Sequence, residues 1–532
     1  MPRGGSMATA LKTGMRTLDE SFAKLLDSDT NADQVTAAMR RDEPIHPGPT
    51  LVPTARYISR EYHELEKERL WSKVWQMAAH EDDFPNVGDV VPYDIVDKSY
   101  LVVRVADDEY KAYYNACLHR GRKLRESRAK GLDELRCAFH GWAWELDGTL
   151  KQVPCAYDYT DLDREAESLP EVKLGRWGRY LFINPDPDCE PLEDYVGDLS
   201  SQFEVFPYER RYKSAHVAGV IKANWKVVQE AFMESYHVFM THPQALAHGA
   251  HDGDTKYDVF GNYSRAILCG ALDGAGIPDW GPMPEQEAGL VRVRHPLTGT
   301  IYESHGDGVV HVTTRDGKSG KFDSLAKWLE GDTIDANPHM CIVVAGVQLP
   351  DAGVAGVETE NADPEAAMQR LGENASGRAV MSEMQRQVLR EVIPSVADDI
   401  PDIELTAAIY LTLFPNFHPW GSFNRINYRF RPNGDNHEEC IMECMYLSPI
   451  PDDGNYTPVS EIHWLENNDD WTGAPELGSL GGVFNQDVRN MAFVYDGMKA
   501  TARECTRLAD YNETKIRHFH ELYGEWVDDQ RA

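Results

Sequence analysis

Two short pairs of cysteine and histidine lie close together in the first third of this 532-residue sequence. Cys117 and His119 form a Cys-x-His pair, and Cys137 and His140 form a Cys-x-x-His pair after 17 intervening residues. A common zinc site of this composition groups two cysteines before two histidines. A two-iron cluster with thiolates on one iron and imidazoles on the other suits mixed pairs, because each pair gives one ligand to each iron. The spacing favours a [2Fe–2S] cluster, with structural zinc as the alternative.

A second set of candidate ligands follows a helix predicted over 224–242. One face of this helix gathers polar side chains, namely Glu230, Glu234 and His237. A solvated face is the ordinary explanation of such a pattern. His237 and His242 would diverge on a regular helix, so they can share a metal only where the helix widens or ends. Pro243 favours an end at this point.

The sequence around both sets of candidate ligands resembles that of the Rieske non-haem iron oxygenases, the family of aromatic-ring-hydroxylating dioxygenase alpha (terminal oxygenase) subunits. Residues 115–121 and 137–142 resemble the two halves of the Rieske signature. Ala138 stands where proline is common, which does not alter a ligand. Residues 224–226 and 230–242 resemble the catalytic motif of the same family.

The resemblance implies ligands for two metal centres. A Rieske [2Fe–2S] cluster would be held by Cys117, His119, Cys137 and His140. A mononuclear Fe(II) would be held by His237, His242 and Asp487, an arrangement that leaves positions open for O2. A surface or capping aspartate is the alternative for Asp487. Glu234 takes the place of an aspartate thought to bridge the cluster of one subunit to the iron of the next, which implies a catalytic role in relaying the electron.

Composition excludes several partners. A net charge of −34 argues against nucleic acid, because phosphate binding needs a basic surface. No apolar run is long enough to span a membrane and no secretory signal is visible, so we expect a soluble cytoplasmic protein without a membrane partner. No G-x-G-x-x-G motif follows a strand, so reducing electrons must come from another protein, a ferredoxin or reductase.

A basic segment separates the two Cys/His pairs. It contains Arg120, Arg122, Lys123, Arg125, Arg128 and Lys130. Such a patch beside the cluster would steer an acidic electron donor, and a solvated loop is an equal alternative.

Periodicity predicts the elements that position these residues. A helical pattern covers 58–75, and short alternating segments to about residue 185 indicate an all-β unit of hairpins. The stretch 244–340 reads as irregular, with strand-like runs such as 308–313. Further strands are expected at 407–414, 426–430 and 441–447, the last two flanking a turn at 432–434. Two helices carry apolar stripes, one through Met381, Met384, Val388 and Val392, the other over 484–499 and continuing beyond Arg503.

Together, these predicted helices and strands indicate an α+β protein. The resemblance implies a Rieske β-sandwich-like domain plus a helix-grip (START-like) antiparallel-sheet catalytic domain. We expect an N-terminal arm over 1–54, the Rieske domain over 55–190 and the mononuclear-iron domain over 191–532. The family usually assembles as a homotrimer, in some cases with a beta subunit.

The function implied is that of a terminal oxygenase, which uses O2 and electrons from a ferredoxin or reductase to hydroxylate a hydrophobic aromatic or polycyclic small molecule. One alternative is a monooxygenase or demethylase acting on a non-aromatic substrate such as a quaternary amine. Another is a Rieske electron-transfer protein without oxygenase activity. Candidate pocket residues, each equally explained by core packing, are Met233, Phe239, Met240, Phe414 and Tyr428.

Overall fold

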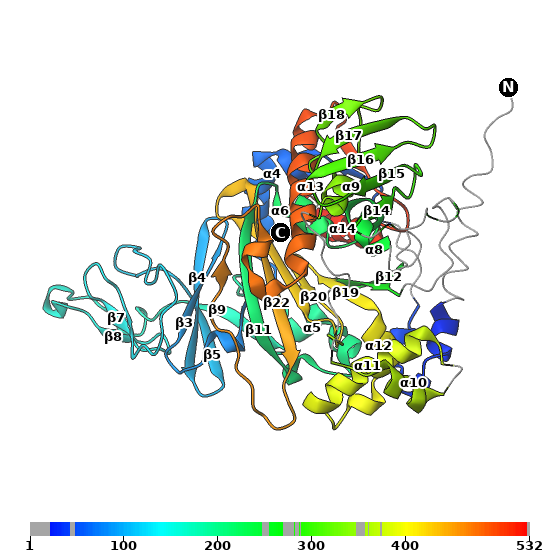
Figure 1. Cartoon of the computed structure of the whole chain (residues 1–532). Coiled ribbons are helices and arrows are strands. Elements are labelled where there is room, and N and C mark those ends of the chain that lie inside the picture. Colours follow the sequence, from blue (N-terminus) through cyan, green and yellow to red (C-terminus); the bar gives the residue numbers. More distant parts are fainter. Residues whose placement is uncertain are drawn as a thin grey trace.

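The computed structural model describes residues 22–42, 48–246, 255–269, 281, 283, 287, 289–346, 357–359, 361–372 and 375–528. Two β-rich bodies dominate it, and Figure 1 shows the smaller one, in blue and cyan, projecting to one side of the larger. This arrangement confirms the expected α+β class. In the described chain, no helix has the length and apolar character required to cross a membrane.

The projecting body is built from hairpins, as alternation over 76–184 predicts. Six antiparallel strands pair in the order β2-β10-β9-β5-β4-β3. Their bounds are β2 (Gln76–His80), β3 (Val90–Ile95), β4 (Lys98–Ala106), β5 (Glu109–Tyr114), β9 (Glu171–Trp177) and β10 (Tyr180–Asn184). A three-stranded sheet extends from it, formed by β6 (Leu135–Arg136), β7 (Ala143–Trp144) and β8 (Leu150–Gln152). The two Cys/His pairs belong to this extension.

The larger body contains an eight-stranded sheet in the order β12-β13-β19-β20-β21-β22-β11-β23, antiparallel except for the β11–β23 pair. The strands are β11 (Arg211–Ile221), β12 (Thr255–Phe260), β13 (Tyr263–Leu268), β19 (Ala408–Leu413), β20 (Phe417–Pro419), β21 (Ile426–Asn433), β22 (Asn436–Pro449) and β23 (His463–Trp464). The hairpin predicted around residues 432–434 joins β21 to β22.

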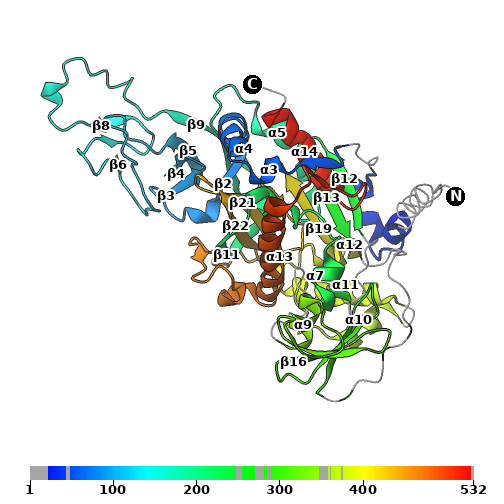
Figure 2. The same ribbon diagram turned by 90° about the horizontal axis from the view of Figure 1, so that it is seen from above.

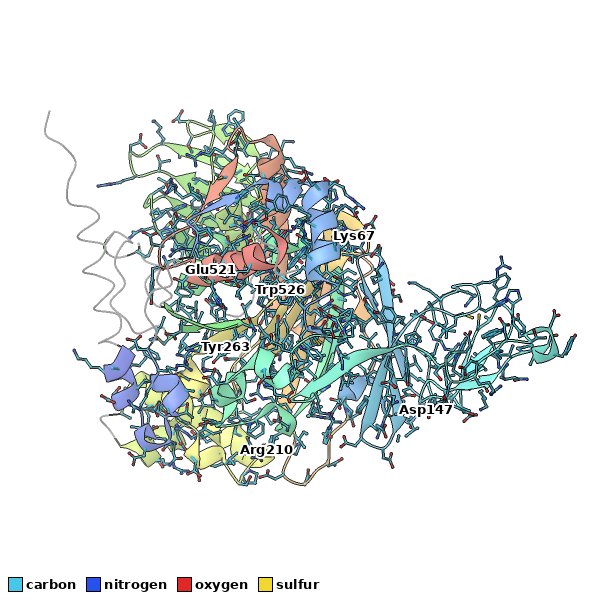
Figure 3. The ribbon with its side chains drawn as sticks, turned by 180° about the vertical axis from the view of Figure 1, so that it is seen from behind. Lys67, Asp147, Arg210, Tyr263, Glu521 and Trp526 are labelled. Atoms are coloured by element: carbon cyan, nitrogen blue, oxygen red, sulfur yellow. The ribbon has the colours of Figure 1, made fainter. Side chains whose placement is uncertain are left out.

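A long C-terminal helix, α13 (Leu480–Ala500), packs on this sheet through its apolar stripe, which includes Phe484, Val488, Met491 and Tyr495. Figure 2 shows α13 lying along β22 and β21. The expectation that this helix continues beyond Arg503 is wrong. It ends at Ala500, and the chain then forms β24 (Cys505–Arg507) against β1 (Leu51–Pro53) before α14 (Thr514–Val527). Seen from behind in Figure 3, Glu521 and Trp526 on α14 lie on the main body, while Asp147 lies on the projection.

The expectation of irregular structure between residues 244 and 340 is also wrong. A five-stranded antiparallel meander occupies its second half, with strands β14 (Val291–Arg294), β15 (Ile301–Ser304), β16 (Val309–Thr313), β17 (Ser319–Asp323) and β18 (Trp328–Gly331). Tight glycine turns connect short strands here, so alternation is too brief to stand out in the sequence. The meander and α9 (Pro338–Val344) share a small core around Val310, Phe322 and Met340.

The remaining helices surround the main sheet. They are α2 (Ala37–Arg40), α3 (Ala55–Ile58), α4 (Arg60–Leu65), α5 (Leu192–Val196), α6 (Trp225–Glu230), α7 (Val238–Thr241), α8 (Pro243–Leu246), α10 (Pro364–Leu371), α11 (Gly377–Val392) and α12 (Asp402–Thr406). The helix predicted over 58–75 corresponds to α3, α4 and a π-helical turn at Glu66–Leu70.

Helix α11 exists as predicted but buries a different face. Met381 is 43% exposed, whereas Glu383 and Arg386 are buried. Arg386 donates to the carboxylate of Asp402 at 2.6 Å and to the carbonyl of Ile400. Ion pairing therefore decides which side of α11 faces inward, and the apolar stripe predicted for it is wrong.

Candidate metal centres and the cavity between them and the sheet

The two Cys/His pairs form matching tight loops. The amide of Cys117 donates to the carbonyl of Arg122, and the amide of Gly121 donates back to Cys117, both at 2.8 Å. The amide of Cys137 likewise donates to Trp142 at 2.8 Å, and that of Gly141 donates to Cys137 at 3.1 Å. Gly121 and Gly141 adopt φ of 74° and 81°, a left-handed conformation that favours glycine.

These loops bring the four predicted cluster ligands together. The imidazole rings of His119 and His140 lie with their centroids 4.6 Å apart, and His119 stacks on Trp142 at 5.3 Å. Both cysteines are buried, whereas His140 is exposed. Burial raises the pKa of Cys117, and the adjacent Cys137 thiol raises it further.

The donor set fits a cluster. Nδ1 of His119 is buried and has no hydrogen-bond partner among the described residues. Two buried thiols beside two imidazoles, one of which reaches the surface, match an iron pair with an inner thiolate side and an outer imidazole side. The disposition favours this cofactor over isolated residues.

The basic segment between the pairs is largely neutralised inside the chain. Its ion pairs are Arg122–Glu126 at 2.8 Å, Lys123–Asp94 at 3.1 Å, Arg128–Asp83 at 2.9 Å and Lys130–Glu461 at 2.5 Å. Four of its six cations therefore have a carboxylate partner, which favours the solvated-loop alternative.

The helix predicted over 224–242 is not continuous. Its first part, α6, ends at Glu230, and α7 begins only at Val238. Between them the amide of His237 donates to the Glu234 carboxylate at 3.0 Å, which replaces the helical bond. The interruption lets His237 and His242 point toward one place, which a regular helix prevents.

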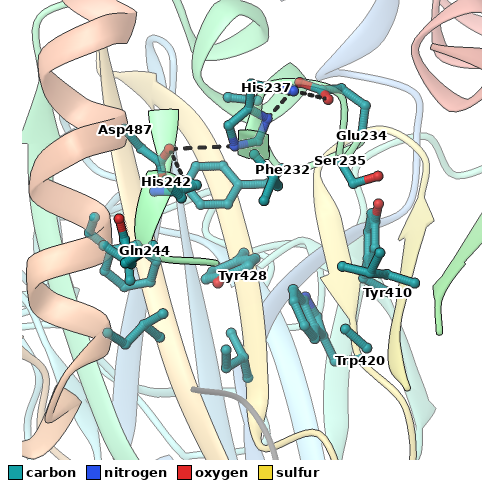
Figure 4. A pocket seen from close by; sticks show the side chains of 18 residues that line it. Phe232, Glu234, Ser235, His237, His242, Gln244, Tyr410, Trp420, Tyr428 and Asp487 are labelled. Atoms are coloured by element: carbon teal, nitrogen blue, oxygen red, sulfur yellow. Dashed lines mark hydrogen bonds and ion pairs between the residues drawn. The ribbon is translucent and has the colours of Figure 1, made fainter. Parts of the chain in front are cut away.

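The structure brings together His237, His242 and Asp487. One nitrogen of each histidine and one carboxylate oxygen of Asp487 all lie within 4.8 Å of one another. Asp487 Oδ1 is 2.9 Å from His242 Nε2 and 3.6 Å from His237 Nε2 (Figure 4). Asp487 is 5% exposed, and this oxygen accepts no hydrogen bond from a described donor. A buried carboxylate of this kind requires a cation, and two imidazoles beside it complete the donor set of a facial triad.

The second nitrogen of each histidine is held in place. Nδ1 of His237 lies 2.7 Å from Glu234, and Nδ1 of His242 lies 2.8 Å from the amide oxygen of Gln486. Burial alone would lower the pKa of His237, but the carboxylates of Glu234 and Asp487 raise it to about 9. Both Nε2 atoms are thereby presented to Asp487. Sequence reasoning missed Gln486, although it directly precedes the predicted ligand.

An apolar cavity of about 280 Å³ opens beside these three residues. Its walls come from α13, from the main sheet and from the segments beside them, and include Phe232, Leu268, Ala408, Tyr410, Trp420, Ile426, Tyr428, Leu480, Val483 and Phe484. Among the predicted pocket residues only Tyr428 lines it. Met233 and Phe414 belong to the core, Met240 is not among the lining residues, and the side chain of Phe239 lies outside the described part. Tyr410 and Trp420 could not be predicted as cavity residues from the sequence, because aromatic residues in or beside strands usually reflect packing.

Comparison with known families gives two separate matches along the chain. Residues 74–164 match the Rieske [2Fe-2S] domain. Residues 203–303 and 346–529 match the catalytic domain of the ring hydroxylating alpha subunit.

Individual relatives include both amine and arene oxygenases. The carnitine monooxygenase oxygenase subunit of Escherichia coli (strain K12) is 31% identical over 194 residues, which is 36% of this chain and 52% of that protein. This chain thus spans about half the length of the curated relatives it matches. A solved quaternary ammonium Rieske monooxygenase superposes with TM-score 0.52 at 16% identity, covering 90% of this chain and 96% of the other. Naphthalene 1,2-dioxygenase from Rhodococcus sp. bound to indole gives 0.51 at 18%, covering 97% and 99%. These structures share the fold.

Proposed function

The chain belongs to the family of ring hydroxylating alpha subunits with a Rieske [2Fe-2S] domain, and from this premise we propose that it is a terminal oxygenase that hydroxylates a hydrophobic aromatic or polycyclic small molecule. One observation carries the proposal: His237, His242 and Asp487 converge beside an apolar cavity that aromatic side chains line. Apolar walls with a few polar groups at one end are typical of small-molecule sites.

Each centre is assigned to its own residues. We propose that Cys117, His119, Cys137 and His140 hold the [2Fe–2S] cluster and that His237, His242 and Asp487 hold the mononuclear iron. When bound, the cluster supplies electrons and the iron supplies O2 activation. Glu234 fixes the ring of His237 through Nδ1, and Gln486 does the same for His242.

The projection of the Rieske extension away from the iron site supports a proposal of electron transfer between subunits. Figures 1 and 2 both show the β6–β8 extension projecting away from the main body, and Figure 2 shows α7 on that body. We propose that the extension of one copy reaches the iron site of its neighbour in a homotrimer, with Glu234 at the junction. Electrons would come from a ferredoxin or reductase, and a beta subunit remains an optional addition.

The division of the chain is part of the proposal. We propose an arm over 1–54, a Rieske domain over 55–190 and an iron domain over 191–532. The gap between the two family matches, which falls between residues 164 and 203, supports the division near residue 190.

Oxidation of a quaternary amine is a second candidate function. The aromatic walls, including Phe232, Trp420 and Tyr428, would attract a quaternary ammonium by cation–π interaction. The E. coli relative is named a carnitine monooxygenase oxygenase subunit.

The test combines metal analysis with turnover. The purified protein should contain about three irons per chain, two in the cluster and one in the triad. Asp487→Ala should lose about one of these, keep the visible spectrum of the cluster, and lower substrate-dependent O2 uptake by at least about 100-fold. Asp496→Ala, an exposed position on the same helix, is the matched control.

Two outcomes would contradict this assignment. Wild-type protein with about two irons would indicate an electron carrier. Asp487→Ala with unchanged iron content would remove Asp487 from the ligand set. Product analysis with labelled O2 then separates dihydroxylation of an arene from oxidation of an amine.

A further inference from the structure

The break between α6 and α7 leaves a backbone amide without its helical acceptor. In a continuous helix the amide of Ser235 would donate to the carbonyl of Ala231, four residues earlier. In the structure it donates instead to the hydroxyl of Tyr257, at 3.1 Å. Tyr257 lies on β12, so a strand of the main sheet supplies the acceptor that the interrupted helix lacks.

The side chain of Ser235 is held by the same strand. Its hydroxyl lies 2.5 Å from that of Thr255 and 3.1 Å from that of Tyr257. The hydroxyl of Tyr410, on β19, points toward it as well (Figure 4). We call these four residues the hydroxyl cluster, and all of them are buried. Hydrogen bonds in such a water-poor place are stronger than at the surface, and neighbouring ones reinforce each other.

Apolar packing would be the simpler way to fill the place of the hydroxyl cluster. Thr255 and Tyr257 are alternate residues of β12 and therefore share one face of the strand. Both direct a hydroxyl at Ser235, although burying a hydroxyl is costly unless it is hydrogen-bonded. Burial raises the pKa of Tyr257 to about 12, so the phenol keeps its proton and can accept from the Ser235 amide and donate at the same time. Because hydrogen bonds are directional, the cluster fixes Ser235 more narrowly than apolar contacts would.

Ser235 lies in the turn that carries one candidate iron ligand and its neighbour. Glu234 directly precedes it, and the Glu234 carboxylate accepts from the amide of His237 at 3.0 Å and lies 2.7 Å from Nδ1 of its ring. On the other side of that ring, Nε2 lies 3.6 Å from Asp487. A shift of Ser235 would therefore move Glu234 and turn the imidazole away from the other two candidate ligands.

We propose that Thr255 and Tyr257 are positioning residues for the mononuclear iron, because they hold Ser235 and so set the turn that aims Nε2 of His237 at the metal. Neither residue lines the cavity beside the iron ligands. Their effect on the metal therefore passes through Ser235 and not through the substrate. This inference rests on the proposed iron site and deepens it.

Removing single hydroxyls from β12 tests the proposal. Tyr257→Phe keeps the ring and Thr255→Val keeps the branched side chain, while each loses one hydroxyl. Each should weaken Fe(II) binding by the full chain, with its cluster in place, by about tenfold, the lower end of the usual effect of losing an outer partner of a metal ligand. Competition with a chelator measures the affinity. The EPR spectrum of Co(II) bound in place of the iron, recorded with the cluster oxidised, should also change shape.

A conservative variant and a distant one serve as controls. Thr255→Ser keeps the hydroxyl and should bind Fe(II) within about threefold of wild type. Tyr195 on α5 is 3% exposed and donates to the carbonyl of Phe414 at 2.8 Å. Tyr195→Phe also loses a buried hydroxyl bond, so it should lower the urea midpoint as Tyr257→Phe does, yet keep the Fe(II) affinity within about twofold.

Three results would overturn the inference. The first is wild-type Fe(II) affinity in both Tyr257→Phe and Thr255→Val, whatever their stability. The second is an equal loss of affinity in Tyr195→Phe, and the third is a Thr255→Ser variant as weak as Thr255→Val. Wild-type protein without triad iron would instead overturn the oxygenase assignment, and this inference with it.

Discussion

The amide oxygen of Gln486 lies 2.8 Å from Nδ1 of His242, so helix α13 supplies a candidate ligand, Asp487, and also the group that orients another. Gln486 is buried and also contacts Gln244 at 2.8 Å. Gln486 therefore orients His242 toward Asp487, the next residue on the same helix.

Removing this acceptor should weaken metal binding. We expect Gln486→Leu to lower affinity for Fe(II) by about 10- to 100-fold, the usual effect of losing a group that orients a histidine ligand. Gln486→Glu keeps an oxygen at the same place and should retain affinity within a few fold. Competition with a chelator measures both constants. Equal affinities for Gln486→Leu and wild type would show that the contact is dispensable.

Two substitutions of Glu234 can separate the effect of its hydrogen bonds from the effect of its charge. Its carboxylate contacts both the amide and Nδ1 of His237. Glu234→Gln retains an acceptor but no charge, so iron content should remain while product formation falls by about 100-fold, the scale of losing one electrostatic contact in a reacting site. Glu234→Ala should in addition lose iron. Stopped-flow oxidation of the reduced cluster tests whether the loss lies in electron transfer, and an unchanged rate in Glu234→Gln would contradict that role.

A buried ion pair holds the two bodies together. Glu443 on β22 is fully buried and pairs with Arg429, which also donates to the carbonyls of Met77 at 2.9 Å and Ala78 at 2.8 Å on β2. Glu443→Ala should lower the free energy of unfolding by about 3–5 kcal/mol, because Arg429 would stay buried without a counter-charge. Glu438→Ala, exposed on the same strand, should change it by about 0.5 kcal/mol or less. Urea unfolding compares the two, and similar losses would refute the assignment.

Glu404 should make stability depend on pH. Burial raises the pKa of Glu404 to about 7, although Arg211 opposes the shift. The folded state then holds a proton that the unfolded state releases near its ordinary pKa of about 4.3, so this residue lowers stability as pH rises from there to about 7. Glu404→Gln should match wild type near pH 4.5 and exceed it in unfolding midpoint at pH 8. A constant difference across this range would contradict the shift.

The sequence correctly predicts the structural features that depend on closely spaced motifs or on strong hydrophobic periodicity. The Cys/His loops, the β21–β22 hairpin and the apolar stripe of α13 all lie where those signals place them. The face of α11 was mispredicted because Arg386 finds Asp402, a partner that helical periodicity does not contain. The interruption between α6 and α7 depends on a side-chain contact of Glu234, which propensity cannot register.

The helix that follows the five-stranded meander is linked to the candidate iron ligands. His339, on the helix that ends the meander, lies 3.0 Å from the amide oxygen of Asn490, and Asn490 donates to Thr241 at 2.9 Å, one residue before His242. The catalytic-domain family match omits residues 304–345, the stretch that contains His339. A segment outside the family match thus supports the loop that carries His242, and an engineer who excised it to obtain a smaller oxygenase would also remove a support of the proposed metal site.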